Sequence, residues 1–177
     1  MKTFTTASSF KVLMAVAVVL FILGIAMIDS AGAGEKKTVT YTKTSTRDIS
    51  RNDVSPGDNP KHKMTQRVRI DVIKYSDPDF GSSEDWVYGQ SDSYAGTGAH
   101  RGYTISNYEN GDQTYQKWEG THKTTIKESG GWESKYEGTY EFLSGTGKFE
   151  NIKGNGVYRG TITPKGLTEE GEATVEY

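Results

Sequence analysis

The chain has 177 residues, a length that suits one domain of ordinary size together with a targeting segment. Its formal net charge of -2 excludes a strongly basic surface and argues against nucleic acid as a partner. The sequence holds no cysteine but 21 glycines and 11% aromatic residues, which excludes a disulfide scaffold and favours strands and tight turns over helices.

The first predicted element is an apolar segment at residues 12–28. Two lysines precede it and the small residues at 31–33 follow it, a pattern typical of a signal peptide cleaved before Gly34. The run is also nearly long enough to span a bilayer, so an uncleaved anchor that tethers the protein to the inner membrane is the alternative. Either interpretation places the remaining domain, residues 34–177, outside the cytoplasm, in the periplasm or secreted.

From residue 38 onward, apolar and polar residues alternate in short runs separated by turn residues, which is typical of strands. The expected strands are residues 38–44, 67–75, 85–94, 102–108, 114–120, 132–142, 154–163 and 172–177. The polar segments 45–63 and 76–83 are expected to be loops. The Asn110-Gly111 pair predicts a tight hairpin turn, because these residues tolerate the positive φ that such a turn requires.

The alternation in two strands indicates which side chains face the core. In the strand at 132–142, Trp132, Tyr136 and Tyr140 share one face, and charged residues occupy the other. In the strand at 67–75, valines and an isoleucine alternate with arginines and an aspartate. We expect the apolar set inside and the charged set on the opposite face.

These elements predict an all-β fold, most simply a single antiparallel barrel of about eight strands of the lipocalin kind, with a sandwich as the alternative. No convincing amphipathic helix follows the leader. A final strand that ends at Tyr177 can pair with the first strand and remove both exposed edges, which favours the barrel. Eight strands enclose an interior wide enough for packed side chains or for one small ligand.

Residues 144–160, with the sequence SGTGKFENIKGNGVYRG, carry a resemblance to a known family. The segment is similar to the GGTGKF-x-x-x-x-G segment of the dirigent and allene oxide cyclase barrels. It resembles more closely a set of uncharacterised exported bacterial proteins with the same GTGKF signature. The similarity covers roughly residues 98–177 and implies an allene oxide cyclase-like barrel. Ser144 stands where the plant proteins usually have glycine, and no catalytic residue is carried over. We expect Phe149 and Ile152 to plug one end of the barrel.

No catalytic, metal or cofactor signature stands out in the chain. His62, His100 and His122 match no zinc spacing, and we interpret them as surface or rim residues. The glutamates at 133, 137 and 141, and those at 169, 170 and 172, are interpreted as solvated. We therefore predict no catalytic residue, no metal and no cofactor.

The inward aromatic side chains are the one feature that indicates a function. The candidate lumen residues are Trp86, Tyr88, Tyr103, Trp118, Trp132, Tyr136 and Tyr140. They would line a cavity for a small apolar or aromatic molecule, and several tyrosine hydroxyls would need partners there. The competing interpretation is that these rings simply fill the core of a small barrel.

Three functions follow from these alternatives. The first is an exported barrel that binds a small hydrophobic or aromatic ligand in its lumen. The second is a non-catalytic structural or interaction protein of the cell envelope with a packed lumen, which would expose an apolar patch. The third, suggested by the resemblance, is an isomerase or cyclase, which would need a carboxylate of perturbed pKa beside the cavity. The sequence favours a role without catalysis, and contact with a membrane only through an uncleaved leader.

Overall fold

The computed structural model describes residues 35–128 and 130–177. The predicted signal segment at 12–28 and the cleavage site before Gly34 lie outside these residues. The described elements are β1 (Lys37–Val54), β2 (His62–Tyr75), β3 (Ser82–Tyr94), β4 (Thr97–Tyr108), β5 (Gln113–Ile126), β6 (Trp132–Gly145), the 3-10 helix η1 (Gly147–Phe149), β7 (Lys153–Thr163) and β8 (Gly166–Glu176). Over the described ranges, no helix has the length and apolar character needed to cross a bilayer.

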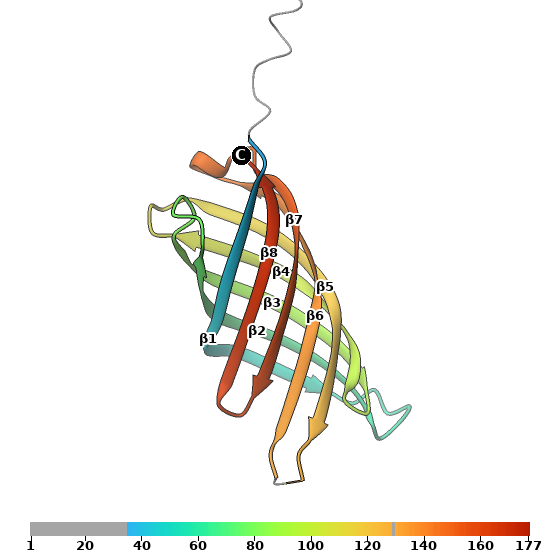
Figure 1. Cartoon of the computed structure of the whole chain (residues 1–177). Coiled ribbons are helices and arrows are strands. Elements are labelled where there is room, and N and C mark those ends of the chain that lie inside the picture. The colour runs from blue at the N-terminus through green and yellow to red at the C-terminus, as the bar shows by residue number, and fades with distance from the viewer. Residues whose placement is uncertain (1–34, 129) are drawn as a thin grey trace, which may run out of the picture. The chain divides into compact units, whose positions relative to one another are not determined.

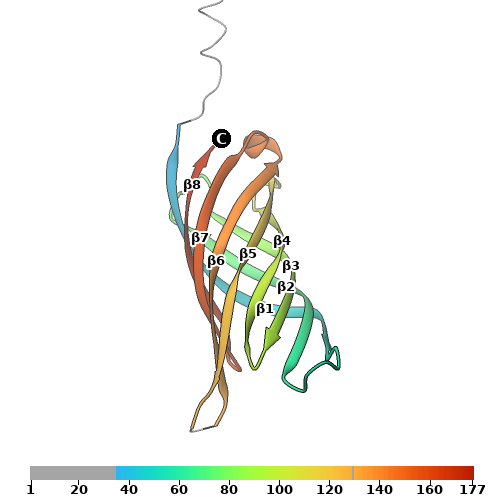
Figure 2. The same ribbon diagram turned by 90° about the vertical axis from the view of Figure 1, so that its right-hand side faces the viewer.

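The eight strands form one closed antiparallel barrel (Figures 1 and 2). Each strand pairs with the next along the chain, and β8 pairs with β1, with Tyr41 opposite Gly171. Closure leaves no unpaired sheet edge, which is the physical advantage that a barrel has over an open sheet. The all-β fold class and its closure by the C-terminal strand are therefore confirmed.

The predicted loop at 45–63 is largely strand. β1 continues to Val54 and β2 begins at His62, so the connection is much shorter than expected. Register shifts between Ser45 and Arg47 and between Asp48 and Ser50 interrupt the β1–β2 ladder. Such irregularities increase the local bend of a strand. Residues 47–54 of β1 are all exposed to solvent, which accounts for their polar, loop-like composition.

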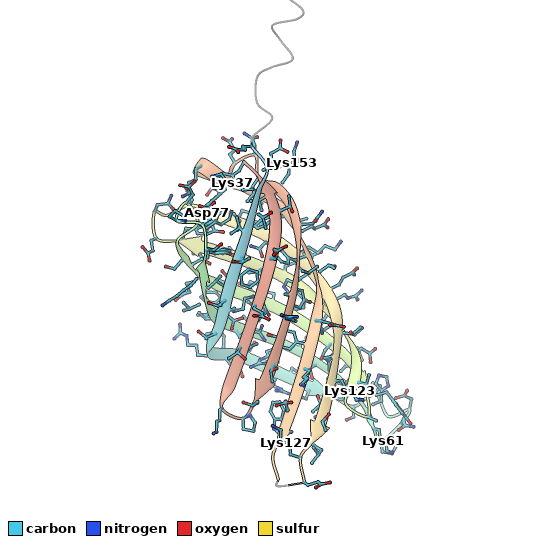
Figure 3. The ribbon with its side chains drawn as sticks, in the orientation of Figure 1. Lys37, Lys61, Asp77, Lys123, Lys127 and Lys153 are labelled. Carbon is cyan, nitrogen blue, oxygen red and sulfur yellow. The ribbon has the colours of Figure 1, made fainter. Side chains whose placement is uncertain are left out.

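One end of the barrel is closed by aromatic rings. Phe149 of η1 is fully buried, and its ring centroid lies 4.7 Å from that of Tyr108, 4.9 Å from that of Phe80 and 5.2 Å from that of Tyr177. Ile152 is also buried beside this cluster. The expectation that Phe149 and Ile152 plug a barrel end is confirmed. In Figure 3 this is the end that carries the labelled Lys37 and Lys153.

Tyrosine rings in the lumen lie across glycines of the neighbouring strand. Four such pairs occur in register: Tyr41 with Gly171, Tyr136 with Gly160, Tyr140 with Gly156, and Tyr158 with Gly138. A Cβ added at Gly171 would overlap the side chain of Tyr41. A Cβ added at the glycine of each other pair would likewise overlap the tyrosine opposite it. Because these glycines have no side chain, the tyrosine rings can pack directly against the backbone of the neighbouring strand inside the barrel.

Candidate functional site: a cavity in the open half of the barrel

The half of the barrel away from the aromatic plug holds a cavity of about 620 Å³. Its mouth lies at the end where the β1–β2, β3–β4, β5–β6 and β7–β8 connections gather (Figure 1). Trp118, Tyr136, Tyr140 and Tyr158 form an aromatic part of its wall. A volume of several hundred Å³ is typical of sites for small organic molecules.

Four of the seven aromatic residues proposed for the lumen line this cavity: Trp118, Trp132, Tyr136 and Tyr140. The inward placement of Trp86, Tyr88 and Tyr103 is wrong. Tyr88 and Tyr103 are opposite each other in register and are 42% and 55% exposed on the outer face. On β3 the inward residues are instead Asp85, Val87 and Gly89, and alternation then turns Trp86 outward.

A buried glutamate organises the polar part of the wall. Glu169 accepts hydrogen bonds from the hydroxyls of Tyr41 and Tyr136, at 2.9 Å each, one on either carboxylate oxygen. The Nζ of Lys43 lies 3.2 Å from Glu169 Oε1, and both side chains are almost wholly buried. The tyrosine hydroxyls and the ammonium therefore satisfy a carboxylate that would otherwise be costly to bury.

The charges of this cluster stabilise each other. Burial alone would raise the pKa of Glu169, but the positive charges of Lys43 and Arg69 and the two tyrosine hydrogen bonds lower it overall. Burial alone would lower the pKa of Lys43, and the neighbouring charge of Glu169 raises it overall. Burial, followed by the charge of Glu169, raises the pKa of Tyr136 well above its ordinary range. The glutamate is therefore ionised and its tyrosine partners are neutral at physiological pH.

Two further carboxylates lie in the lumen below the cavity. Asp71 and Asp85 are fully buried and opposite each other on β2 and β3. Arg69 Nε donates to Asp71 at 2.8 Å, and the Ser83 hydroxyl donates to Asp85 at 2.8 Å. Burial, opposed in part by the charge of Lys43, raises the pKa of Asp85 to about 6. The expectation that the charged set of β2 points away from the core is therefore wrong, since Arg69 and Asp71 face the lumen.

Two histidines belong to the cavity wall rather than to the outer surface. His100 and His122 have ring centroids 5.8 Å apart, and His100 Nε2 lies 2.8 Å from the hydroxyl of Tyr158. Burial, with a contribution from His122, lowers the pKa of His100 to about 4, and burial also lowers the pKa of His122. Both rings are neutral near pH 7. His62 differs, because contacts with Asp92 and Asp58 raise its pKa.

The residues missed at the sequence level are mainly charged side chains that face inward. Glu169 was expected to be solvated, in a segment before the strand predicted at 172–177. Strand β8 instead begins at Gly166, so Glu169 lies within the strand and is buried. Alternation upstream from the buried Ala173 and Val175 reaches position 169, so the sequence pattern did carry a signal for Glu169. Alternation from the buried Val39 and Tyr41 likewise reaches Lys43, although the threonines between them give this strand little apolar contrast. Within the described ranges, no three His, Asp or Glu side chains gather as a metal site.

Comparison with known proteins adds a likeness in fold to a solved structure. No protein-family model matches the chain, and no curated protein matches it. A solved structure of a pterocarpan synthase dirigent protein is similar at a TM-score of 0.46 and 10% sequence identity, over 84% of this chain and 88% of that chain. The barrel assignment itself rests on the strand pairing of the chain.

Proposed function

We propose that the barrel binds a small aromatic or hydrophobic molecule in the cavity at its open end. The observation that carries this proposal is a cavity of about 620 Å³ with Trp118, Tyr136, Tyr140 and Tyr158 on its wall. Flat aromatic side chains offer large contact areas at a small entropic cost, because few of their torsions must be fixed. The buried polar groups that interrupt this wall provide orientation for a ligand.

The aromatic wall is held in place before any ligand enters. The indole N–H of Trp118 donates to the Thr104 hydroxyl at 3.1 Å, and its six-membered ring lies over Gly102. Tyr136 is fixed by its bond to Glu169. A preformed wall reduces the ordering that a ligand would otherwise have to impose.

The proposal is tested by a matched pair of tryptophan variants. Thermal-shift screening with phenolic and lipid-like compounds would identify a ligand, since binding to the folded state raises the unfolding midpoint with ligand concentration. Trp118→Phe, on the cavity wall, is expected to weaken that ligand several-fold. Trp86→Phe, on the outer face, is expected to leave affinity unchanged. Equal effects of the two substitutions, or no stabilising compound, would contradict lumen binding.

The alternative of an interaction protein with a packed lumen is less well supported, because the open half of the lumen holds the cavity. The observation in its favour is the exposed pair Tyr88 and Tyr103 on the outer face. Replacement of both by serine would change the elution volume or cross-linking pattern if this face binds another protein. Unchanged association would leave the cavity as the functional site.

The geometry gives less support to an isomerase or cyclase. A general base needs a carboxylate that can take up a proton near neutral pH. Among the described residues on the cavity wall, the single carboxylate is Glu169, whose pKa is lowered and whose oxygens are occupied by Tyr41, Tyr136 and Lys43. Asp85 has the raised pKa but does not line the cavity.

We also propose that the barrel acts outside the cytoplasm, because residues 12–28 have the pattern of an export signal. N-terminal sequencing of the protein recovered from the cell envelope and medium tests this. A mature chain that begins at Gly34 supports cleavage. An intact N-terminus in a membrane fraction supports the tethered form, and a protein confined to the cytoplasm overturns the proposal.

A further inference from the structure

The cavity wall carries an excess of positive charge. Six cationic side chains line it, and all come from β1, β2 and the connection between them: Lys43, Arg51, Lys61, Lys63, Arg67 and Arg69. Glu169 is the single carboxylate among the described lining residues. This local charge is opposite in sign to the net charge of -2 for the whole chain. Composition alone therefore does not account for the cationic wall.

The two innermost cations are already neutralised by the protein. Lys43 pairs with Glu169 at 3.2 Å, and Arg69 pairs with Asp71 at 2.8 Å. Their side chains are only 10% and 13% exposed. These pairs stabilise the interior and leave no uncompensated charge for a ligand deep in the cavity.

The four cations nearer the mouth are less completely paired. Arg51 Nε lies 3.1 Å from an Asp53 oxygen, and Lys63 Nζ reaches the other oxygen of the same carboxylate only at 3.8 Å. The Nε of Arg67 donates to a carboxylate oxygen of Asp48. The two terminal nitrogens of its guanidinium can therefore donate to other acceptors. No carboxylate of the described chain forms an ion pair with Lys61.

Two carboxylates, Asp48 and Asp53, form ion pairs with cations of this set in the described part of the chain, and Asp58 and Asp92 contact His62 instead. The aromatic wall lies deeper and on the other strands. We infer that the ligand is an aromatic carboxylate, whose ring lies against Trp118 and Tyr136 and whose anionic group meets Lys61, Lys63 and the free nitrogens of Arg51 and Arg67. This inference rests on the proposed binding function and specifies its ligand class. Guanidinium and ammonium groups beside a partly closed cavity hold a carboxylate by charge-assisted hydrogen bonds.

Naphthalene-2-carboxylate and naphthalene-2-carboxamide provide the test, because they share one shape and differ in charge. Calorimetric titration of the full-length protein at low ionic strength is expected to give about tenfold tighter binding of the carboxylate, as expected for a charge-assisted contact. Added salt should reduce that preference, because the mouth is exposed to solvent. Inorganic phosphate alone should bind far more weakly than the aromatic acid.

Two lysine pairs at the same barrel end supply matched variants. Lys61→Gln/Lys63→Gln removes two charges from the mouth and should abolish most of the preference, with carboxamide affinity unchanged. Lys123→Gln/Lys127→Gln makes the same charge change outside the cavity lining, at the barrel end that also carries Lys61 in Figure 3, and should preserve the preference. Circular dichroism of both variants confirms that the barrel is intact.

The possible outcomes distinguish a failure of the inferred ligand class from a failure of the proposed binding function. Equal affinity for the acid and the amide overturns the anionic ligand class while the binding function stands. Equal losses of preference in the two double variants would also overturn it, because the net charge of the protein would then explain the effect. Phosphate that binds as tightly as the aromatic acid overturns the aromatic part. If neither naphthalene compound binds, both the proposed binding function and the inferred ligand class are contradicted.

Discussion

Asp71 and Asp85 are opposite each other on β2 and β3, and each keeps one carboxylate oxygen without a hydrogen-bond partner in the described part of the chain. Both are fully buried. Burial is the main reason why the pKa of Asp85 is raised to about 6, and the nearby charge of Asp71 adds to that effect.

Asp85→Asn is therefore expected to stabilise the protein above pH 6. The ordinary pKa of Asp85 is 3.8 and the folded value is about 6, so the folded state loses stability as pH rises through this interval. Relative to the wild type, the variant should gain about 3 kcal/mol in unfolding free energy between pH 4 and pH 7.5. Urea unfolding at both pH values measures the gain. Asp71→Asn is the control, because it deprives Arg69 of its partner and should destabilise at pH 7.5. A constant difference between Asp85→Asn and the wild type would contradict the argument.

Glu169→Gln should destabilise the barrel at pH 7 by about 3 kcal/mol, because it leaves Lys43 as a buried charge without its anion. The neighbouring Glu170 points outward and pairs with the exposed Arg159. Glu170→Gln should therefore cost less than about 0.5 kcal/mol. Chemical denaturation of both variants provides the comparison. Since the pKa of Glu169 is lowered in the folded state, its contribution is present above its ordinary pKa and declines as pH falls. Equal costs for the two substitutions would show that Glu169 stabilises nothing.

Gly171→Ala should destabilise the protein by about 1–3 kcal/mol, a typical cost of inserting a methyl group into a packed interior. The three atoms nearest to the added Cβ all belong to the side chain of Tyr41, two in its ring and one its hydroxyl oxygen. A double-mutant cycle with Tyr41→Ala isolates this contact, because the glycine substitution should cost much less once the ring is gone. Additive effects in thermal unfolding would instead assign the cost to the backbone.

Alternation predicted correctly which face of a strand points inward where bulky apolar residues and charged residues occupy strictly alternate positions. In β6 this placed Trp132, Tyr136 and Tyr140 inside, as the structure confirms. In β3 the same reasoning placed Trp86 and Tyr88 inside, but there the inward positions hold Asp85 and Gly89. The preference for large aromatic residues in a core fails where the lumen contains a polar cluster.

The polar cluster itself depends on contacts that no local pattern reveals. Lys43 and Glu169 are far apart in sequence, and they meet because β1 and β8 close the barrel in the register that places one opposite the other. Closure was predicted, but a register is fixed only when both strand ends and the bulges of β1 are known. The same is true of Asp71 and Asp85, which become neighbours only through the register of β2 against β3.

The histidines offer a direct test of the site electrostatics by NMR. His100 is expected to titrate near pH 4 and His122 below its ordinary value, whereas His62 should titrate above it. Because the folded pKa of His100 lies below the ordinary 6.5, its neutral form stabilises the fold above that pH, and this contribution is lost as pH falls toward 4. His100→Gln should therefore resist acid unfolding better than the wild type. Nitrogen chemical shifts recorded from well below pH 4 up to pH 8 give all three pKa values in one sample. A His100 that titrates near 6.5 would mean that water and ions fill the cavity freely, and the preformed aromatic site would lose its support.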